Sequence, residues 1–197
     1  MRRFACAILL ATGLTLHTGD RVSAQVYVEP FAGVLIVEDG GLEHLGFSID
    51  PSAYVGGALG YTLRPGWEIA AAYGWAPAIL TDDETGAEED LFIHAYYAAV
   101  NYVRALSDPW SFVASVGAGG MTIQDDTVAD DSSDPMVTLG GGLRYRASER
   151  FSIQGIVRDH IQLCKGLEGD EFAVSICPDD DSPRHHVEIS GGVLILF

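Results

Sequence analysis

Apolar and polar residues alternate with a period of two over long parts of the chain, which is the spacing of the two faces of an extended strand. The pattern is clearest over residues 185–197. One face of this segment is apolar and consists of Val187, Ile189, Gly191, Val193, Ile195 and Phe197. The other face carries His186, Glu188, Ser190 and Gly192. Because the chain ends on this strand and no later element is available to cover its apolar face, we expect lipid to cover it.

The same alternation predicts eight strands, at residues 26–37, 52–63, 67–76, 91–106, 110–123, 136–146, 151–161 and 185–197. Short turns at 64–66, 107–109 and 147–150 alternate with long loops at 38–51, 77–90, 124–135 and 162–184. Long loops gathered at one end are typical of a membrane barrel. Helical periodicity is nearly absent, and glycine pairs inside the strands suit a tightly curved sheet. The sequence therefore predicts an all-β fold, an eight-stranded antiparallel up-and-down transmembrane β-barrel with short periplasmic turns and long extracellular loops.

Each of the three short turns has a tyrosine before it and a large aromatic residue after it. The six residues are Tyr61, Trp67, Tyr102, Trp110, Tyr145 and Phe151. Tyr and Trp rings settle where hydrocarbon meets the lipid headgroups, so these positions predict an aromatic girdle. In the alternative interpretation they plug the bottom of a soluble barrel. A lipid-facing girdle also decides which face of each strand points outward.

With this assignment the outward positions are mainly apolar and the inward positions mainly polar, the reverse of soluble barrels with an apolar lumen. Four inward positions are charged: Glu68, Arg144, Arg158 and Glu188. An unpaired charge away from water costs several kcal/mol, so we expect these residues to form an internal salt-bridge network. In the alternative interpretation they line a narrow ion path.

Residues 1–24 have the organisation of a cleaved secretory signal peptide. Arg2 and Arg3 precede an apolar run from Phe4 to Leu16, and small residues precede a predicted cleavage site after Ala24. Elsewhere, no apolar stretch approaches the roughly 18 residues of a membrane helix. The sequence therefore predicts an exported chain in which residues 25–197 form one domain.

These features together resemble the small outer-membrane β-barrel superfamily of the OmpA/OmpX type. The resemblance implies that the chain lies in the bacterial outer membrane, in contact with its lipid and lipopolysaccharide, and we expect a monomer. It also implies that the barrel-assembly machinery recognises the last strand through Ile189, Val193, Ile195 and Phe197. The resemblance is architectural and includes no catalytic motif.

Most of the 28 acidic residues lie in the four long loops, and the formal net charge is −17. Nucleic acid is an unfavourable partner for this surface, because a phosphate backbone requires a basic face. The loops form either a solvated, self-repelling surface or sites for Ca²⁺ or Mg²⁺, which prefer carboxylate oxygens. The second interpretation assigns the ligands to Asp125, Asp126, Asp179, Asp180 and Asp181. Their spacing does not match an EF-hand loop, and we expect no other cofactor.

The predicted function is a non-enzymatic role in the cell envelope, in which the loops interact with lipopolysaccharide, cations or surfaces. A narrow, porin-like channel is the second hypothesis. A lipid-modifying hydrolase is the third, because the outer rim offers the residue types of acyl transfer at Ser132, Ser133, Asp159, His160 and Ser182. Their spacing matches no acyl-transfer motif, so we assign no catalytic residue.

Cys164 and Cys177 are the two cysteines of the predicted mature domain, and both lie in the longest loop. In an oxidising compartment two such residues predict a disulfide bond. The bond would contribute about 3 kcal/mol to stability in the chain-entropy model. A metal site built from two cysteines alone is the weaker hypothesis.

Overall fold

The computed structural model describes residues 25–38, 47–125, 132–163 and 183–197. These ranges contain nine strands: β1 (Val26–Ile36), β2 (Phe47–Ile49), β3 (Ser52–Arg64), β4 (Trp67–Asp82), β5 (Glu88–Ser107), β6 (Trp110–Asp125), β7 (Ser132–Arg146), β8 (Phe151–Gln162) and β9 (Arg184–Leu196). Within the same ranges, no helix has the length and apolar character needed to cross a membrane.

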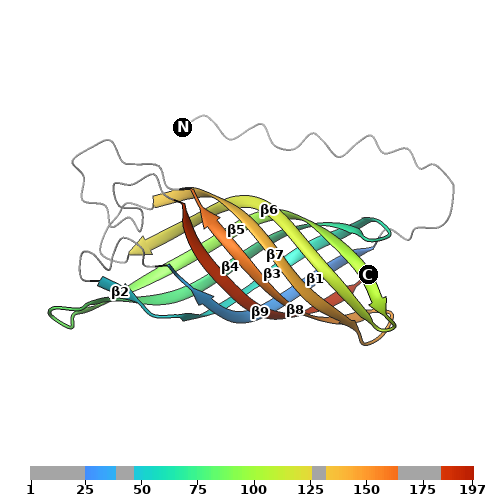
Figure 1. The fold of residues 1–197 in the computed structure, drawn as a ribbon, viewed down its shortest axis with the longest axis horizontal. Coiled ribbons are helices and arrows are strands. Elements are labelled where there is room, and N and C mark those ends of the chain that lie inside the picture. The colour runs from blue at the N-terminus through green and yellow to red at the C-terminus, as the bar shows by residue number, and fades with distance from the viewer. Residues whose placement is uncertain (1–24, 39–46, 126–131, 164–182) are drawn as a thin grey trace.

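Eight of the strands close into a ring (Figure 1). Each pairs antiparallel with its neighbours in the order β1-β3-β4-β5-β6-β7-β8-β9, and the pairing of β9 with β1 completes the circle. The ninth strand, β2, pairs with β4 beyond the point where β4 leaves β3. The predicted eight-stranded antiparallel barrel is therefore confirmed, with β2 as an addition at its rim.

The hairpin between β4 and β5 differs most from the predicted strand limits. The sequence predicted a loop over residues 77–90, but β4 continues to Asp82 and β5 begins at Glu88. Pro77 is exposed and stays in register opposite Phe92. The hairpin extends beyond the rest of the barrel at the long-loop end (Figure 1).

The hairpin persists because its inward positions continue an apolar face. Ala78 and Leu80 of β4 and Leu91 and Ile93 of β5 are buried, so their contacts stabilise the extended pairing. Its tight end needs a glycine, since Gly86 has a φ of 67°, in the left-handed region.

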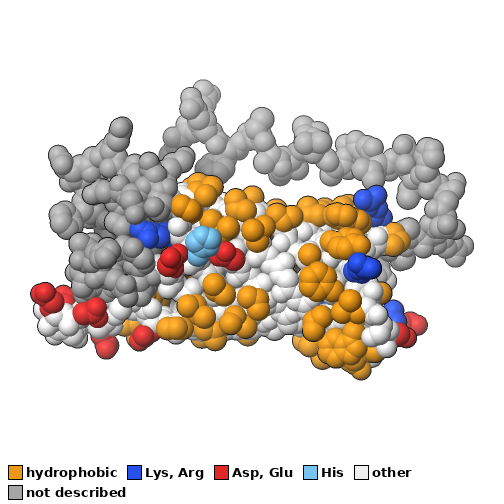
Figure 2. Space-filling model, in the orientation of Figure 1, with side chains coloured by type: hydrophobic (Ala, Val, Ile, Leu, Met, Phe, Trp, Pro, Cys, Tyr) orange, Lys and Arg blue, Asp and Glu red, His pale blue; other side chains and the backbone are white. Residues whose placement is uncertain are grey.

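The outer wall of the barrel is apolar, as predicted. Large exposed hydrophobic side chains occur on the outward positions of the eight ring strands, among them Val34, Leu59, Ile69, Val100, Val116, Leu139, Val157 and Ile189. Figure 2 shows this apolar wall, with acidic side chains on the β4–β5 hairpin and basic side chains gathered at the short-turn end. The two ends of the barrel therefore differ in charge.

The lumen is polar only in part. The prediction of a polar interior holds for β8 and β9 but was wrong for the rest of the long-loop half. That half holds a cluster of buried apolar side chains: Phe31, Leu35, Val37, Ile49, Tyr54, Ala76, Ala78, Leu80, Leu91, Ile93, Ala95, Tyr97, Ala99, Met121, Ile123 and Met136. Several of them lie on strand segments that the sequence assigned to loops. A lumen only as wide as its side chains can be filled by close packing as well as by ion pairs.

Inward glycines make room for the largest inward side chains. A Cβ atom added at Gly60 would lie 2.0 Å from Cζ of Tyr27. A Cβ atom added at Gly74 would lie 2.0 Å from the hydroxyl oxygen of Tyr54. Both tyrosines are fully buried. The position of each ring therefore depends on the missing side chain of the neighbouring strand.

We predict that Gly60→Ala and Gly74→Ala each destabilise the barrel by about 1–3 kcal/mol, because an overpacked interior must move a buried ring. The measurement is the free energy of unfolding in urea for protein refolded into lipid vesicles. Gly155→Ala is the matched control, because an added Cβ there meets nothing within 4 Å. Equal effects at all three positions would contradict the packing explanation.

Candidate functional site in the lumen

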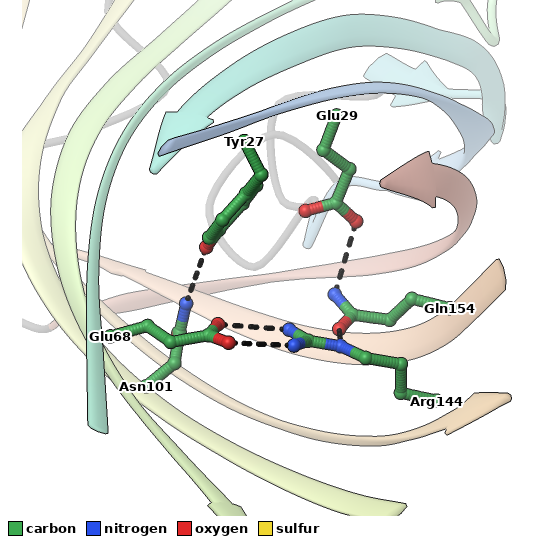
Figure 3. A network of polar contacts seen from close by, with 6 residues as sticks. All are labelled: Tyr27, Glu29, Glu68, Asn101, Arg144 and Gln154. Carbon is green, nitrogen blue, oxygen red and sulfur yellow. Dashed lines mark hydrogen bonds and ion pairs between the residues drawn. The ribbon is translucent and has the colours of Figure 1, made fainter. Parts of the chain in front are cut away.

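The charged pair nearer the short-turn end connects β4 and β7 across the lumen (Figure 3). Nη1 of Arg144 donates a hydrogen bond to Oε1 of Glu68 at 2.7 Å, and Nη2 donates to Oε2 at 3.0 Å. Only 11% of the Arg144 side chain and 9% of the Glu68 side chain are exposed. A two-point contact with little water around it is the strongest form of ion pair available to these groups.

Neighbouring side chains extend this pair to other strands. Nε of Arg144 donates to Oε1 of Gln154 at 2.9 Å, and Nε2 of Gln154 donates to Oε1 of Glu29 at 3.1 Å. The strand register explains the first contact, because Gln154 of β8 lies directly opposite Arg144 of β7. The carboxylate of Glu29, on β1, thus obtains a partner although its side chain is buried.

Asn101 and Tyr27 complete this end of the lumen. The Nδ2 group of Asn101 donates to the hydroxyl of Tyr27 at 3.4 Å, and Asn101 lies opposite Glu68 in the register of β4 and β5. Figure 3 shows the six polar side chains converging on one level of the barrel. Five strands contribute to this level, so a change in any one of them would disturb the others.

A second charged group lies on β8 and β9. Nη1 of Arg158 donates to Oε1 of Glu188 at 2.5 Å, and the two residues are cross-strand partners. Nε2 of His160 lies 2.9 Å from Oε2 of Glu188. The hydroxyl of Ser190 also donates to Oε1 of Glu188. The side chains of Glu188 and His160 are fully buried, so the carboxylate exchanges water for three protein partners.

A third polar group lies closer to the long-loop end. The backbone N–H of Glu38 donates to Nδ1 of His186 at 3.4 Å, which makes Nδ1 an acceptor. Nε2 of His186 therefore carries the hydrogen and donates it to Oε1 of Gln162 at 2.8 Å. Nε2 of Gln162 donates in turn to Oδ2 of Asp134 at 2.8 Å. The inward side of β8 and β9 thus carries polar groups along most of its length.

The four predicted interior charges all point into the lumen. The structure brings them together as two pairs, Glu68 with Arg144 and Arg158 with Glu188. Each pair has its own hydrogen-bond partners, and the pairs lie at different levels of the barrel.

Sequence reasoning placed one histidine incorrectly. It assigned His160 to the outer rim, whereas its side chain is fully buried inside the lumen, as is that of His186. The period-two alternation held the missing signal, because His160 shares a face with Arg158 and His186 with Glu188. His185 lies on the outer face, where its Nδ1 atom is 2.8 Å from Oδ2 of Asp159.

Among the described residues of the lumen, these contacts connect neighbouring strands, and Ser190 and His160 do not form an acyl-transfer pair. Ser190 and His160 both contact Glu188, but among the hydrogen bonds of the described residues neither contacts the other. A nucleophile needs a base within hydrogen-bond reach and access to substrate, whereas both side chains are buried.

The six predicted girdle residues lie exposed on the outer wall at the short-turn end. Trp67 packs against Tyr102 with ring centroids 5.1 Å apart, and Trp110 packs against Tyr145 at the same distance. Both contacts join cross-strand partners. The predicted assembly signal also lies on the outer wall, where Ile189, Val193 and Phe197 are exposed and Ile195 is half-buried.

Several predicted residues lie outside the described part of the chain: Cys164, Cys177, Asp126, Asp179, Asp180 and Asp181. Asp125 ends β6, and only its backbone is described. Within the described ranges, no group of three or more His, Cys, Asp or Glu side chains could hold a metal ion. The disulfide and the cation sites stay predictions.

We predict that Glu68→Gln lowers the free energy of unfolding by about 3–5 kcal/mol, because it leaves the Arg144 guanidinium buried without its counterion. Combining it with Arg144→Gln should recover part of this loss, since no buried charge then remains. Asp108→Asn is the control: it breaks the exposed pair with Arg146 at 2.6 Å and should cost less than about 1 kcal/mol. Urea titration monitored by tryptophan fluorescence measures all four proteins. A Glu68→Gln variant as stable as the parent would contradict the role of the pair.

The chain resembles known proteins in family and in fold. A family model described as the outer membrane protein beta-barrel domain matches residues 6–176. No curated protein matches the chain significantly. Neisserial surface protein A (NspA) has 14% identity and a TM-score of 0.66, with 87% of this chain and 97% of that chain covered. The N-terminal β-barrel domain of Pseudomonas aeruginosa OprF has 17% identity and a TM-score of 0.52, with 88% and 97% covered.

At these identities the solved structures establish the fold, and the family model establishes the family and the location. The short turns therefore face the periplasm and the long loops the cell exterior. The chain belongs to the outer membrane protein beta-barrel domain family, and it is a protein of the bacterial outer membrane.

Proposed function

We propose that this chain is a non-enzymatic envelope protein whose lumen is closed and whose activity lies at its extracellular end. The observation that carries the proposal is the two-point ion pair between Glu68 and Arg144, which crosses the lumen with little exposure. Apolar side chains pack in the other half of the lumen, beside the buried polar groups of β8 and β9. The interior of an eight-stranded barrel is only wide enough for its own side chains. The loops and the rim are therefore the surfaces available to bind partners.

The β4–β5 hairpin supports an extracellular binding role. It carries six acidic residues: Asp82, Asp83, Glu84, Glu88, Glu89 and Asp90. Figure 2 shows acidic side chains at this end of the barrel. Hydrogen bonds from the backbone N–H groups of Thr85 and Glu84 hold the pKa of Asp82 below its usual value. This end of the barrel is therefore strongly negative at neutral pH.

A negative rim and lipopolysaccharide, itself anionic, repel each other unless cations lie between them. Ca²⁺ and Mg²⁺ prefer carboxylate and phosphate oxygens and can bridge the two. We therefore propose that divalent cations mediate contact between the acidic hairpin and lipopolysaccharide.

The cation proposal predicts that about 1 mM calcium, the range of weak extracellular sites, increases binding of the folded barrel to lipopolysaccharide by several fold. The triple variant Asp83→Asn, Glu84→Gln, Glu88→Gln should lose most of this increase, because it removes exposed ligands without touching the lumen. Asp108→Asn, which changes one charge at the opposite end, is the control. The readout is surface plasmon resonance with calcium or a chelator. Binding to lipopolysaccharide that does not depend on calcium, or equal binding by the triple variant, would contradict the proposal.

A narrow channel is the second candidate, because the polar groups of β8 and β9 line the lumen from Gln162 to Gln154. The closed-lumen proposal predicts no discrete conductance steps in planar bilayers. The measurement should use only protein that heat-modifiable migration on gels has shown to be folded. Cation-selective steps that disappear on Glu68→Gln or Glu188→Gln would replace the proposal with a channel.

A further inference from the structure

We propose that the periplasmic rim of this barrel is a docking surface for the head groups of anionic phospholipids in the inner leaflet. The surface consists of four exposed arginines at the three short turns: Arg64, Arg104, Arg146 and Arg150. Figure 2 shows basic side chains gathered at this end. The inference is independent of the function proposed for the acidic extracellular end.

The arginines lie at the level of the aromatic girdle. The guanidinium carbon of Arg64 is 5.4 Å from the centre of the Trp67 ring. Arg104 lies two residues beyond Tyr102 on the same outward face, opposite Phe112 of β6. Tryptophan and tyrosine rings mark the boundary between hydrocarbon and head groups. The guanidinium group of Arg64 and the position of Arg104 therefore lie close to the depth of the lipid phosphates.

The direction of the arginine side chains favours lipid over a periplasmic partner. Arg64 stacks on an outward-facing ring, and Arg104 shares the outward face of its strand, so both point sideways from the barrel wall. A cell-wall polymer or an acidic periplasmic protein would approach along the barrel axis. Phospholipid head groups surround the wall at this height and meet these side chains directly.

The charge balance favours anionic over zwitterionic lipid. The same turns contain two acidic residues, Asp108 and Glu149. Asp108 is paired with Arg146, which leaves Glu149 as the other acidic side chain of these turns, beside Arg64, Arg104 and Arg150. A guanidinium group matches a phosphate with two parallel hydrogen bonds, and a basic cluster adds long-range attraction to a negatively charged leaflet.

Quenching of tryptophan fluorescence by brominated lipids can test this proposal. Of the three tryptophans in the chain, Trp67 and Trp110 belong to the girdle, whereas Trp75 lies farther along β4. In a Trp75→Phe background, fluorescence reports only the girdle. Folded protein is placed in vesicles that mix phosphatidylglycerol with phosphatidylethanolamine, and either lipid carries the bromine that quenches tryptophan. The ratio of the two quenching curves gives the relative affinity, and it does not depend on the orientation of the barrel.

We expect about a two- to fivefold preference for phosphatidylglycerol at low salt, which high salt should remove. The triple variant Arg64→Gln, Arg104→Gln, Arg150→Gln should show no preference. The triple lysine variant at the same positions keeps the charge and should retain most of it. Heat-modifiable migration checks the folding of each protein, and Arg104→Gln alone serves if the triple glutamine variant does not fold.

Two results would overturn the proposal. The first is equal quenching by the two lipids in the Trp75→Phe background at low salt. The second is a preference that survives both high salt and the glutamine substitutions, because it would then not depend on the arginines. Binding of the parent, but not of the glutamine variant, to purified peptidoglycan without any lipid preference would assign the rim to the cell wall instead.

Discussion

Pairing of the first ring strand with the last is the interaction on which the rest of the barrel depends. β1 and β9 are in register from Tyr27 opposite Leu196 to Ile36 opposite Val187. This closure removes the free edges that an open sheet would expose to lipid, where unpaired backbone groups are costly. It also fixes the width of the lumen. Eight strands enclose a space that only side chains can fill, so every inward residue must find a partner within it.

The lumen is filled in two physically different ways. In the periplasmic half, charged and amide side chains satisfy one another, as Glu68 does with Arg144. In the extracellular half, apolar side chains pack together around Ile93 and Leu35, beside the hydrogen-bonded polar groups of β8 and β9. Glycine makes room in both halves, since Gly74 accommodates Tyr54 of the apolar cluster and a Cβ at Gly192 would lie 2.7 Å from the Glu29 carboxylate. Inward glycines thus make room for charged side chains in one half of the lumen and for apolar packing in the other.

Period-two alternation was sufficient to predict the eight ring strands, though not all their limits, together with their outward faces and the inward position of all four charges. These features depend on whether a residue faces lipid or the lumen, and the apolar or polar character of the residue follows that choice directly. The partner of each charge was less accessible, because it depends on register around the ring and on which strands lie across the lumen. Glu68 and Arg144 come from strands that do not pair with each other, so no local pattern joins them. Pairing of Arg158 with Glu188 needed the register of β8 and β9.

The extracellular half was predicted less well for a different reason. Beyond Ala76 the alternation continues across Pro77, which is compatible with an exposed position in the strand but resembles a loop in the sequence. The predicted loop at 77–90 therefore removed Ala78, Leu80 and the start of β5 from the interior. His160 was misplaced because histidine suits a solvated rim and a buried hydrogen-bond network equally well.

The contacts that fill the lumen join residues that are distant along the chain. Arg144 is 76 residues from Glu68, and Gln154 is 125 residues from Glu29. Such contacts form only after most of the polypeptide has been arranged, because bringing distant segments together costs chain entropy before any contact repays it. Folding should therefore be slow, with charged side chains still hydrated until the ring shuts. In the reverse direction, no strand can leave without exposing buried charge and open sheet edges together, so the finished barrel resists unfolding through a high kinetic barrier.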